Sequence, residues 1–189
     1  MQTINTQEVK EFIEAQGPNT KIYIGGDSER FLVKGVWYAE YYTVLIVHID
    51  GKHGCKVFGE ISRERDFDQK KNRPRMRLMN EVIKVADLYL KLGDILEDRE
   101  VQIHLDINPD EKYGSSCVIT EAIGYIRGVC NVTPLVKPNA WAASAVADRF
   151  KRVVQHPSLT KSHLSKLVND PDETVREYAS KYKLDTPIT

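Results

Sequence analysis

Residues 21–29 place an alternating strand pattern directly before two glycines and a carboxylate. Ile22 and Ile24 flank Tyr23, and β-branched and aromatic residues favour a pleated, half-buried backbone. The two glycines leave room for another backbone, a substrate or an ion to approach closely. A rigid strand would then present the Asp27 carboxylate, a suitable ligand for Mg²⁺. The same Gly-Gly-Asp-Ser sequence is also typical of a plain turn, so this segment alone leaves both interpretations open.

The first third of the chain predicts a short helix followed by an antiparallel three-stranded unit. Thr6 is placed to cap the helix, and Gly17-Pro18 would end it. Asp50-Gly51 lies between two strand-like segments, and this dipeptide is the strongest short signal for a hairpin. The expected elements are a helix over residues 6–16 and strands over residues 21–27, 36–49 and 55–61.

Residues 62–154 alternate between helical and strand-like periodicity after an initial polar loop. Strands separated by helices favour parallel crossovers, with helices on both faces of the sheet. We therefore expect an α/β fold in which a five-stranded mixed sheet is flanked by helices. The elements expected here are a loop over residues 62–71, helices over 73–92, 116–127 and 140–154, the last capped by Asn139, and strands over 101–107 and 131–136.

The chain is long enough for one domain with a full core and a small appendage. We expect residues 1–154 to form the main domain and residues 155–189 to form an appended helical hairpin. Its two short helices are expected over residues 160–168 and 172–182. One isolated helical pair cannot bury its own apolar face, so the hairpin should dock on the main domain or on a protein partner.

The composition is that of a globular protein rather than a membrane protein. Hydrophobic residues make up 41% and charged residues 29% of the chain, and no apolar run approaches the roughly 18 to 20 residues of a membrane span. The N-terminus has no basic region followed by an apolar core, so no secretory signal is expected. The three cysteines have no CxxC spacing, which favours buried thiols in a reducing cytoplasm.

The formal net charge of +0 limits how the chain could bind nucleic acid, because proteins that rely on non-specific phosphate contacts are usually basic. Binding would need a local basic patch, or metal ions between protein and phosphate. One basic cluster precedes and enters the helix over residues 73–92; a solvated loop is the alternative interpretation. The cluster comprises Arg63, Arg65, Lys70, Lys71, Arg73, Arg75 and Arg77.

Three aspartates lie in or at the end of expected elements that could bring their side chains together. Asp27 ends the first strand, Asp106 lies in the fourth, and Asp148 lies in the last helix of the main domain. If the first and fourth strands are parallel neighbours, Asp27 and Asp106 converge at one edge of the sheet. Asp106 stands between Leu105 and Ile107, and a carboxylate on an apolar strand is costly to bury unless it is paired or bound to metal.

A fourth carboxylate would come from Glu81, on the flank of the apolar stripe of the long helix, or from Glu60, at the end of the third strand. Two neighbouring side chains are candidate accessory groups. Ser28 borders Asp27, and His104 shares the face of Asp106. A histidine satisfied within the core is the alternative for His104.

Together these blocks resemble the ribonuclease H-like superfamily, and more closely its branch of predicted nucleases sometimes called YkuK-like. The resemblance covers about residues 20–152. In this family the long helix usually begins Arg-Met-Glu-Leu-Met, whereas Arg77 stands here at the position of the metal-binding glutamate; the YkuK-like branch uses the position of Glu81 instead. The blocks that carry the resemblance are residues 23–28, 75–81, 104–109, 121–125 and 137–143 running into Asp148.

The resemblance implies a metal-dependent nuclease that hydrolyses phosphodiester bonds of RNA, RNA/DNA hybrid or DNA. Its catalytic and metal-binding set would be Asp27, Glu81, Asp106 and Asp148. Two Mg²⁺ or Mn²⁺ ions roughly 3.5 to 4 Å apart would activate water and stabilise the leaving oxygen. Asp27 would bridge both ions, Asp106 and Glu81 would hold one, and Asp148 the other.

Substrate phosphates are expected to contact Arg73, Arg75 and Lys137. Two other functions stay open. One is a nucleic-acid-binding module on the same fold with weak or no catalysis. The other is a protein-interaction domain that acts through the C-terminal hairpin.

Overall fold

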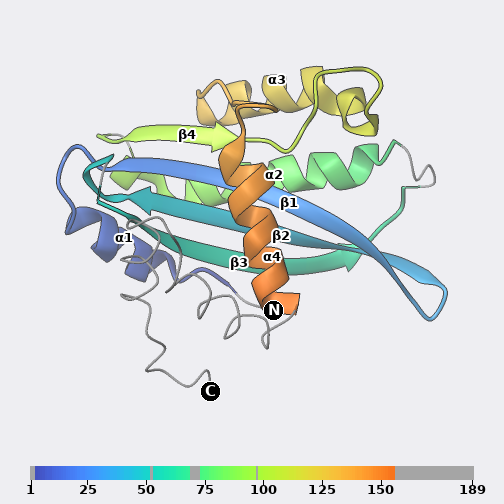
Figure 1. Cartoon of the computed structure of the whole chain (residues 1–189), viewed down its shortest axis with the longest axis horizontal. Coiled ribbons are helices and arrows are strands. Elements are labelled where there is room, and N and C mark those ends of the chain that lie inside the picture. Colours follow the sequence, from blue (N-terminus) through green and yellow to red (C-terminus); the bar gives the residue numbers. More distant parts are fainter. Residues whose placement is uncertain (1–2, 52, 69–72, 97, 156–189) are drawn as a thin grey trace, which may run out of the picture. The chain divides into compact units, whose positions relative to one another are not determined.

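The computed structural model describes residues 3–51, 53–68, 73–96 and 98–155 (Figure 1). The chain divides into two units, Met1–Phe150 and Lys151–Thr189. The predicted helices over residues 160–168 and 172–182 lie outside the described residues. The described elements are α1 (Thr6–Glu14), β1 (Lys21–Val33), β2 (Val36–His48), η1 (Ile49–Gly51), β3 (Cys55–Arg65), α2 (Arg75–Leu92), η2 (Gly93–Leu96), β4 (Glu100–His104), η3 (Gly114–Val118), α3 (Ile119–Cys130), the π-helical η4 (Ala142–Ala147) and α4 (Asp148–Gln155).

The strands β1 and β2 form a long antiparallel hairpin. Their register runs from Lys21 opposite His48 to Val33 opposite Val36, and Lys34-Gly35 closes the turn with positive φ at both residues. Such turns match the twist of the paired strands. The strand continues six residues beyond the predicted end at Asp27, so the alternative that Gly-Gly-Asp-Ser forms a turn is wrong. Pairing with β2 keeps this segment extended.

The strand β4 lies beside β1 in parallel, which is the condition on which the expected convergence of Asp27 and Asp106 depended. The register runs only from Lys21 opposite Glu100 to Gly25 opposite His104. The β1 residues after Gly25 are therefore not paired with β4. The predicted strand over residues 101–107 ends three residues early, which places Asp106 after the strand rather than within it.

The sheet has four strands in the described part of the chain, in the order β3-β2-β1-β4. The predicted fifth strand over residues 131–136 is wrong. Leu135 forms only an isolated parallel bridge with His104, and its amide donates to the Ile103 carbonyl at 2.8 Å. Pro134 and Pro138 flank this bridge, and proline has no amide hydrogen with which to extend a ladder.

Four other boundaries also differ from expectation. The side chain of Asn5, not Thr6, caps α1, and β3 extends to Arg65 through part of the predicted loop. A 3-10 turn precedes α3, which therefore begins at Ile119 rather than at residue 116. The last helix opens as the π-helix η4, and no side chain caps it; the Asn139 carbonyl instead accepts a hydrogen bond from the Trp141 amide.

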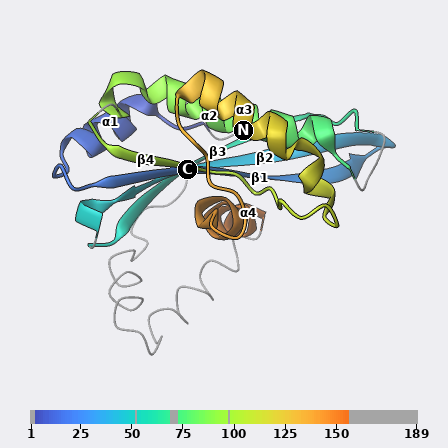
Figure 2. The same cartoon turned by 90° about the horizontal axis from the view of Figure 1, so that it is seen from above.

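Helices cover both faces of the sheet in the unit Met1–Phe150. The helices α1, α2 and α3 lie over one face, whereas η4 and the first turn of α4 lie over the other (Figure 2). The first face holds the main apolar core, in which Ile22 and Ile24 of β1 pack with Val82 and Val85 of α2. The second face holds a smaller apolar cluster, which includes Tyr23 and Ala142. Successive β1 residues therefore alternate between α2 and η4.

Two glycines let the last helix cross the sheet closely. A Cβ on Gly25 would lie 2.7 Å from the Ala143 nitrogen, and a Cβ on Gly59 would collide with the Phe150 ring. Both glycines are paired with Val44 of β2, so they belong to one row across the sheet. Residues 142–150 therefore follow this row, from Gly25 of β1 to Gly59 of β3.

We predict that Gly25→Ala lowers the free energy of unfolding by at least about 2 kcal/mol, because the new methyl group meets backbone atoms of Ala142 and Ala143 that cannot rotate away. Gly124→Ala is the matched control. Nothing lies within 4 Å of the Cβ position in that helix, so the variant should gain about 0.5 to 1 kcal/mol. Urea unfolding would measure both; equal effects of the two substitutions would contradict the close packing at Gly25.

Candidate acidic site at the open edge of β1

The first predicted site residue, Asp27, lies on β1 just beyond the end of β4. Its side chain is half-buried, and the Ser28 amide donates to its Oδ1 at 2.8 Å. Asp27 alternates with Gly26 and shares a face with Gly25, so its side chain is directed to the side of η4. Because β4 has ended, this position borders the open edge of the sheet.

The second residue, Glu81, comes from α2 on the other face of the sheet and is only 4% exposed. Gly26 makes room for it, because a Cβ at Gly26 would lie 3.2 Å from the Glu81 Cγ. The Ser28 hydroxyl donates to Glu81 Oε2 at 2.6 Å. Glu81 is therefore fixed against β1 at the place where the strand loses its neighbour.

A chain of hydrogen bonds extends this contact to Arg77. Its Nη1 donates to both the carbonyl and the hydroxyl oxygen of Ser28, each at 2.7 Å. The side chain of Ser28 thus links Arg77 to Glu81. This link was not predicted from the sequence, although Arg77 and Glu81 are four residues apart on α2 and such pairs share a helix face.

The pKa of the Glu81 carboxyl group is shifted by its burial and by two other carboxylates. Burial raises the pKa of Glu81 to about 8, and the negative charges of Asp27 and Asp106 act in the same direction. The Ser28 hydrogen bond and the Arg77 charge oppose this shift but do not cancel it. Without a bound cation Glu81 is therefore protonated at neutral pH.

The third residue, Asp106, lies two residues after β4 and pairs with Lys137. The Lys137 Nζ is 2.8 Å from Asp106 Oδ1, and the Asp106 side chain is 22% exposed. The Lys137 amide donates to the Ile107 carbonyl at 3.0 Å, which fixes the lysine backbone beside this loop. Both residues are candidates from the sequence, but their ion pair was not predicted.

Asp148, the fourth predicted residue, is the first residue of α4 and is half-buried. It follows η4 and so lies on the η4 side of the sheet, as Asp27 does. It is not among the groups that shift the pKa of Glu81. Among the described residues, no three His, Cys, Asp or Glu side chains are grouped so that they could hold a metal ion.

Two other predicted residues have different surroundings. Glu60, the alternative to Glu81, lies 3.9 Å from Lys91 near the far end of α2. The His104 ring is buried, and its Nδ1 accepts a hydrogen bond from the Ala142 amide at 3.0 Å. Burial lowers the pKa of His104 to about 4, which keeps the ring neutral. The structure thus favours the core interpretation of this histidine.

The predicted basic cluster is not one continuous patch in the described part of the chain. Arg63 pairs with Glu40 at 2.7 Å, and Arg75 pairs with Glu121 at 2.6 Å. Arg73 is exposed just before α2. Lys70 and Lys71 lie outside the described residues.

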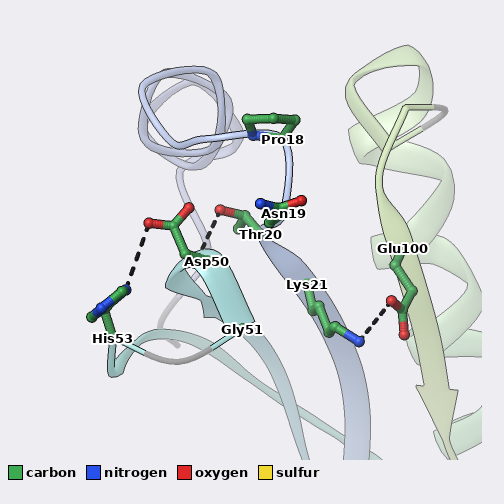
Figure 3. Close-up of a pocket in the computed structure, with 8 residues that line it drawn as sticks. All are labelled: Pro18, Asn19, Thr20, Lys21, Asp50, Gly51, His53 and Glu100. Atoms are coloured by element: carbon green, nitrogen blue, oxygen red, sulfur yellow. Dashed lines mark hydrogen bonds and ion pairs between the residues drawn. The ribbon is translucent and has the colours of Figure 1, made fainter.

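A pocket at the opposite end of the sheet contains none of the predicted site residues (Figure 3). It lies where β1 and β4 begin, and Lys21 pairs with Glu100 there at 2.8 Å. Across the pocket, Asp50 lies 3.7 Å from His53. These pairs are separate from the acidic site, which lies beyond the other end of β4.

We predict that Glu81→Gln stabilises the metal-free protein increasingly as pH rises from about 4.5 to 8. In this range the unfolded carboxyl group is ionised but the folded one keeps its proton, so Glu81 lowers stability by up to about 1.4 kcal/mol per pH unit. Thermal unfolding of both proteins in EDTA at pH 5, 6.5 and 8 measures the difference. A difference that is the same at all three values would contradict the raised pKa.

None of the three cysteines forms a disulfide, and only Cys130 is buried, so the expectation of buried thiols holds for one of the three. No helix among the described residues is long and apolar enough to cross a membrane. No curated protein and no solved structure matches the sequence. The family model described as Ribonuclease H-like matches residues 5–152. This range contains all four predicted carboxylates and most of the chain, and the chain belongs to the ribonuclease H-like family.

Proposed function

We propose that this protein is a metal-dependent nuclease that hydrolyses phosphodiester bonds of RNA, RNA/DNA hybrid or DNA. Family membership supports a nuclease-type fold. The observation that carries the proposal is that Asp27 and Glu81 both accept a hydrogen bond from Ser28, at 2.8 and 2.6 Å, just beyond the last β1 residue that is paired with β4. Fold alone would not suffice, because one fold hosts many functions.

The donor set suits Mg²⁺ or Mn²⁺, since both take hard oxygen ligands. Asp27, Glu81, Asp106 and Asp148 would hold the metal, with two ions expected. A bound pair of ions would supply activation of water and stabilisation of the leaving oxygen. A cation would also reverse the electrostatics at Glu81, because it favours the ionised carboxylate that Asp27 and Asp106 now disfavour.

The surrounding residues would orient these carboxylates and balance their charge. Ser28 directs one oxygen of Glu81, and Arg77 holds Ser28 in place. Lys137 neutralises Asp106 and would be released when a cation takes over that carboxylate. The freed ammonium group, with Arg73 and Arg75, would then contact substrate phosphate.

A second candidate is a nucleic-acid-binding module with weak or no catalysis. Arg77 occupies the family position of a metal-binding glutamate, and Asp106 is already neutralised by Lys137. Both features oppose metal binding. Membership of the YkuK-like branch, a cytoplasmic location and a protein partner for the C-terminal hairpin remain proposals alongside the main one.

We expect Asp27→Asn and Asp106→Asn to abolish Mn²⁺-dependent cleavage of labelled RNA, DNA and hybrid substrates, because each removes one charged ligand. Glu81→Gln should do the same. Glu60→Gln is the matched control and should stay active, since Glu60 faces Lys91. Circular dichroism would check folding. Full activity of the Asp27 or Asp106 variant, or loss of activity only with Glu60→Gln, would overturn the assignment.

We also expect Lys137→Met to tighten Mn²⁺ binding measured calorimetrically without nucleic acid, by about threefold to tenfold, because Lys137 competes for the Asp106 carboxylate. The matched control is Lys112→Met, since Lys112 pairs with Asp110 at 2.7 Å outside the proposed set. It should leave the affinity unchanged. Weaker Mn²⁺ binding by the Lys137 variant would show that the lysine does not compete with the metal.

A further inference from the structure

The face of the sheet that carries Asp27 continues outward past the last helix. Directly opposite residues in an antiparallel pair share a face, so the register defines successive rows. Gly25, Val44 and Gly59 form the row crossed by η4 and α4. The next rows outward contain Asp27 with Tyr42 and Ile61, then Glu29 with Glu40 and Arg63, then Phe31 with Tyr38 and Arg65.

The row of Phe31, Tyr38 and Arg65, together with Arg63 of the neighbouring row, brings half-buried aromatic rings and guanidinium groups together. The rings of Phe31 and Tyr38 are stacked, with centroids 5.9 Å apart and planes at 22°. The Arg63 guanidinium lies 4.7 Å from the Phe31 centroid, and the Arg63 side chain is 55% exposed. Arg65 lies over the exposed ring of Phe67, 5.1 Å from its centroid. We call Phe31, Tyr38, Arg63 and Arg65 the hairpin platform.

The platform lies in line with the acidic site on the same strand. Phe31 is four residues from Asp27, or about 13 Å at the rise of an extended strand. Both side chains are directed to the same face. A strand of nucleic acid that lay along β1 could therefore reach both places.

We propose that the hairpin platform stacks unpaired bases of single-stranded nucleic acid and guides that strand to the acidic site. This inference rests on the proposed function and names its substrate class. Aromatic rings and guanidinium planes stack on bases of any sequence, whereas bases inside a duplex are covered by their neighbours. A single strand is therefore the form of substrate that the platform fits.

The charged side chains near the platform determine whether a bound nucleic-acid strand turns its bases or its phosphates towards the sheet. Glu40 accepts hydrogen bonds from Tyr42 and, at 2.7 Å, from Arg63, and Glu29 is exposed beside it. Arg63 is thus paired within this row, so the middle of the face offers phosphate groups little net positive charge. Arg65 and the turn residue Lys34 provide cations at the end of the hairpin. The bases are thus directed to the sheet and the phosphates outward.

The test is fluorescence anisotropy of the full-length protein with labelled ten-nucleotide single strands of RNA and DNA, in EDTA so that cleavage cannot interfere. Phe31→Leu combined with Tyr38→Leu should weaken binding by about tenfold or more, since each lost stacking contact matters at this scale. Tyr38→Phe should bind normally because it keeps the ring. Thermal unfolding would check that each variant is folded.

Trp37→Leu is the matched control on the opposite face of the same hairpin. Trp37 is 40% exposed, and the Arg30 guanidinium lies 4.2 Å from its ring centroid, so it offers the same chemistry on the face opposite Asp27. Binding should change less than twofold. An equal loss with Trp37→Leu, or equally tight binding of a blunt duplex, would overturn the platform.

The remaining outcomes separate this inference from the proposed function. Single-strand binding that depends on Phe31 and Tyr38 without any Mn²⁺-dependent cleavage would keep the platform and refute the nuclease. Cleavage with unchanged binding by the Phe31 and Tyr38 double variant would do the reverse. A change of oligomeric state in that variant, with unchanged binding, would assign the surface to a second copy of the chain.

Discussion

The burial of Glu81 beside two other carboxylates is the constraint on which the site depends. A buried charge is costly, and like charges nearby increase the cost. The protein offsets part of it through Ser28 and Arg77 and the rest by keeping the proton on Glu81. The carboxyl group is thereby held in a state that a divalent cation would reverse. An arrangement that is unfavourable without metal is what a metal-binding edge of a sheet would require.

The unequal lengths of β1 and β4 create this edge. The strand β1 continues for eight residues after Gly25, the last residue paired with β4. Glu81 can therefore approach from α2 on one face while Asp27 is directed to the other, and both border the same gap in the sheet. The loop that follows β4 brings Asp106 to the gap. No single element carries the site; it arises where one strand ends beside a longer one.

The long hairpin of β1 and β2 carries both Asp27 and the hairpin platform. Glycines at positions 25 and 59 confine the last helix to one row, which leaves the outer rows of this face to Phe31, Tyr38 and the arginines. The basic cluster noticed in the sequence is thus distributed. Arg63 pairs with Glu40 and also stacks on Phe31, Arg75 pairs with Glu121, and Arg65 stacks on Phe67. Stacking and local pairing, rather than one large positive field, fit a chain with a net charge of +0.

Local patterns in the sequence were sufficient for most of the element types and for the antiparallel hairpins, because periodicity and turn residues act over short distances. They also led to Asp27, Glu81 and Asp106 as candidate site residues, which stay a prediction. The lengths of the strands were harder to predict from the sequence. The extension of β1 beyond Asp27 depends on pairing with β2, and the missing fifth strand reflects the prolines around Leu135.

Only the tertiary structure decided which side chains meet. The link from Arg77 through Ser28 to Glu81, the pairing of Asp106 with Lys137 and the burial of His104 against Ala142 join residues that are mostly distant in the chain. The sequence by itself determined where carboxylates, glycines and strands occur. Whether a given carboxylate is protonated, paired with lysine or open to a cation depends on desolvation and neighbouring charges, and those exist only once the chain is packed.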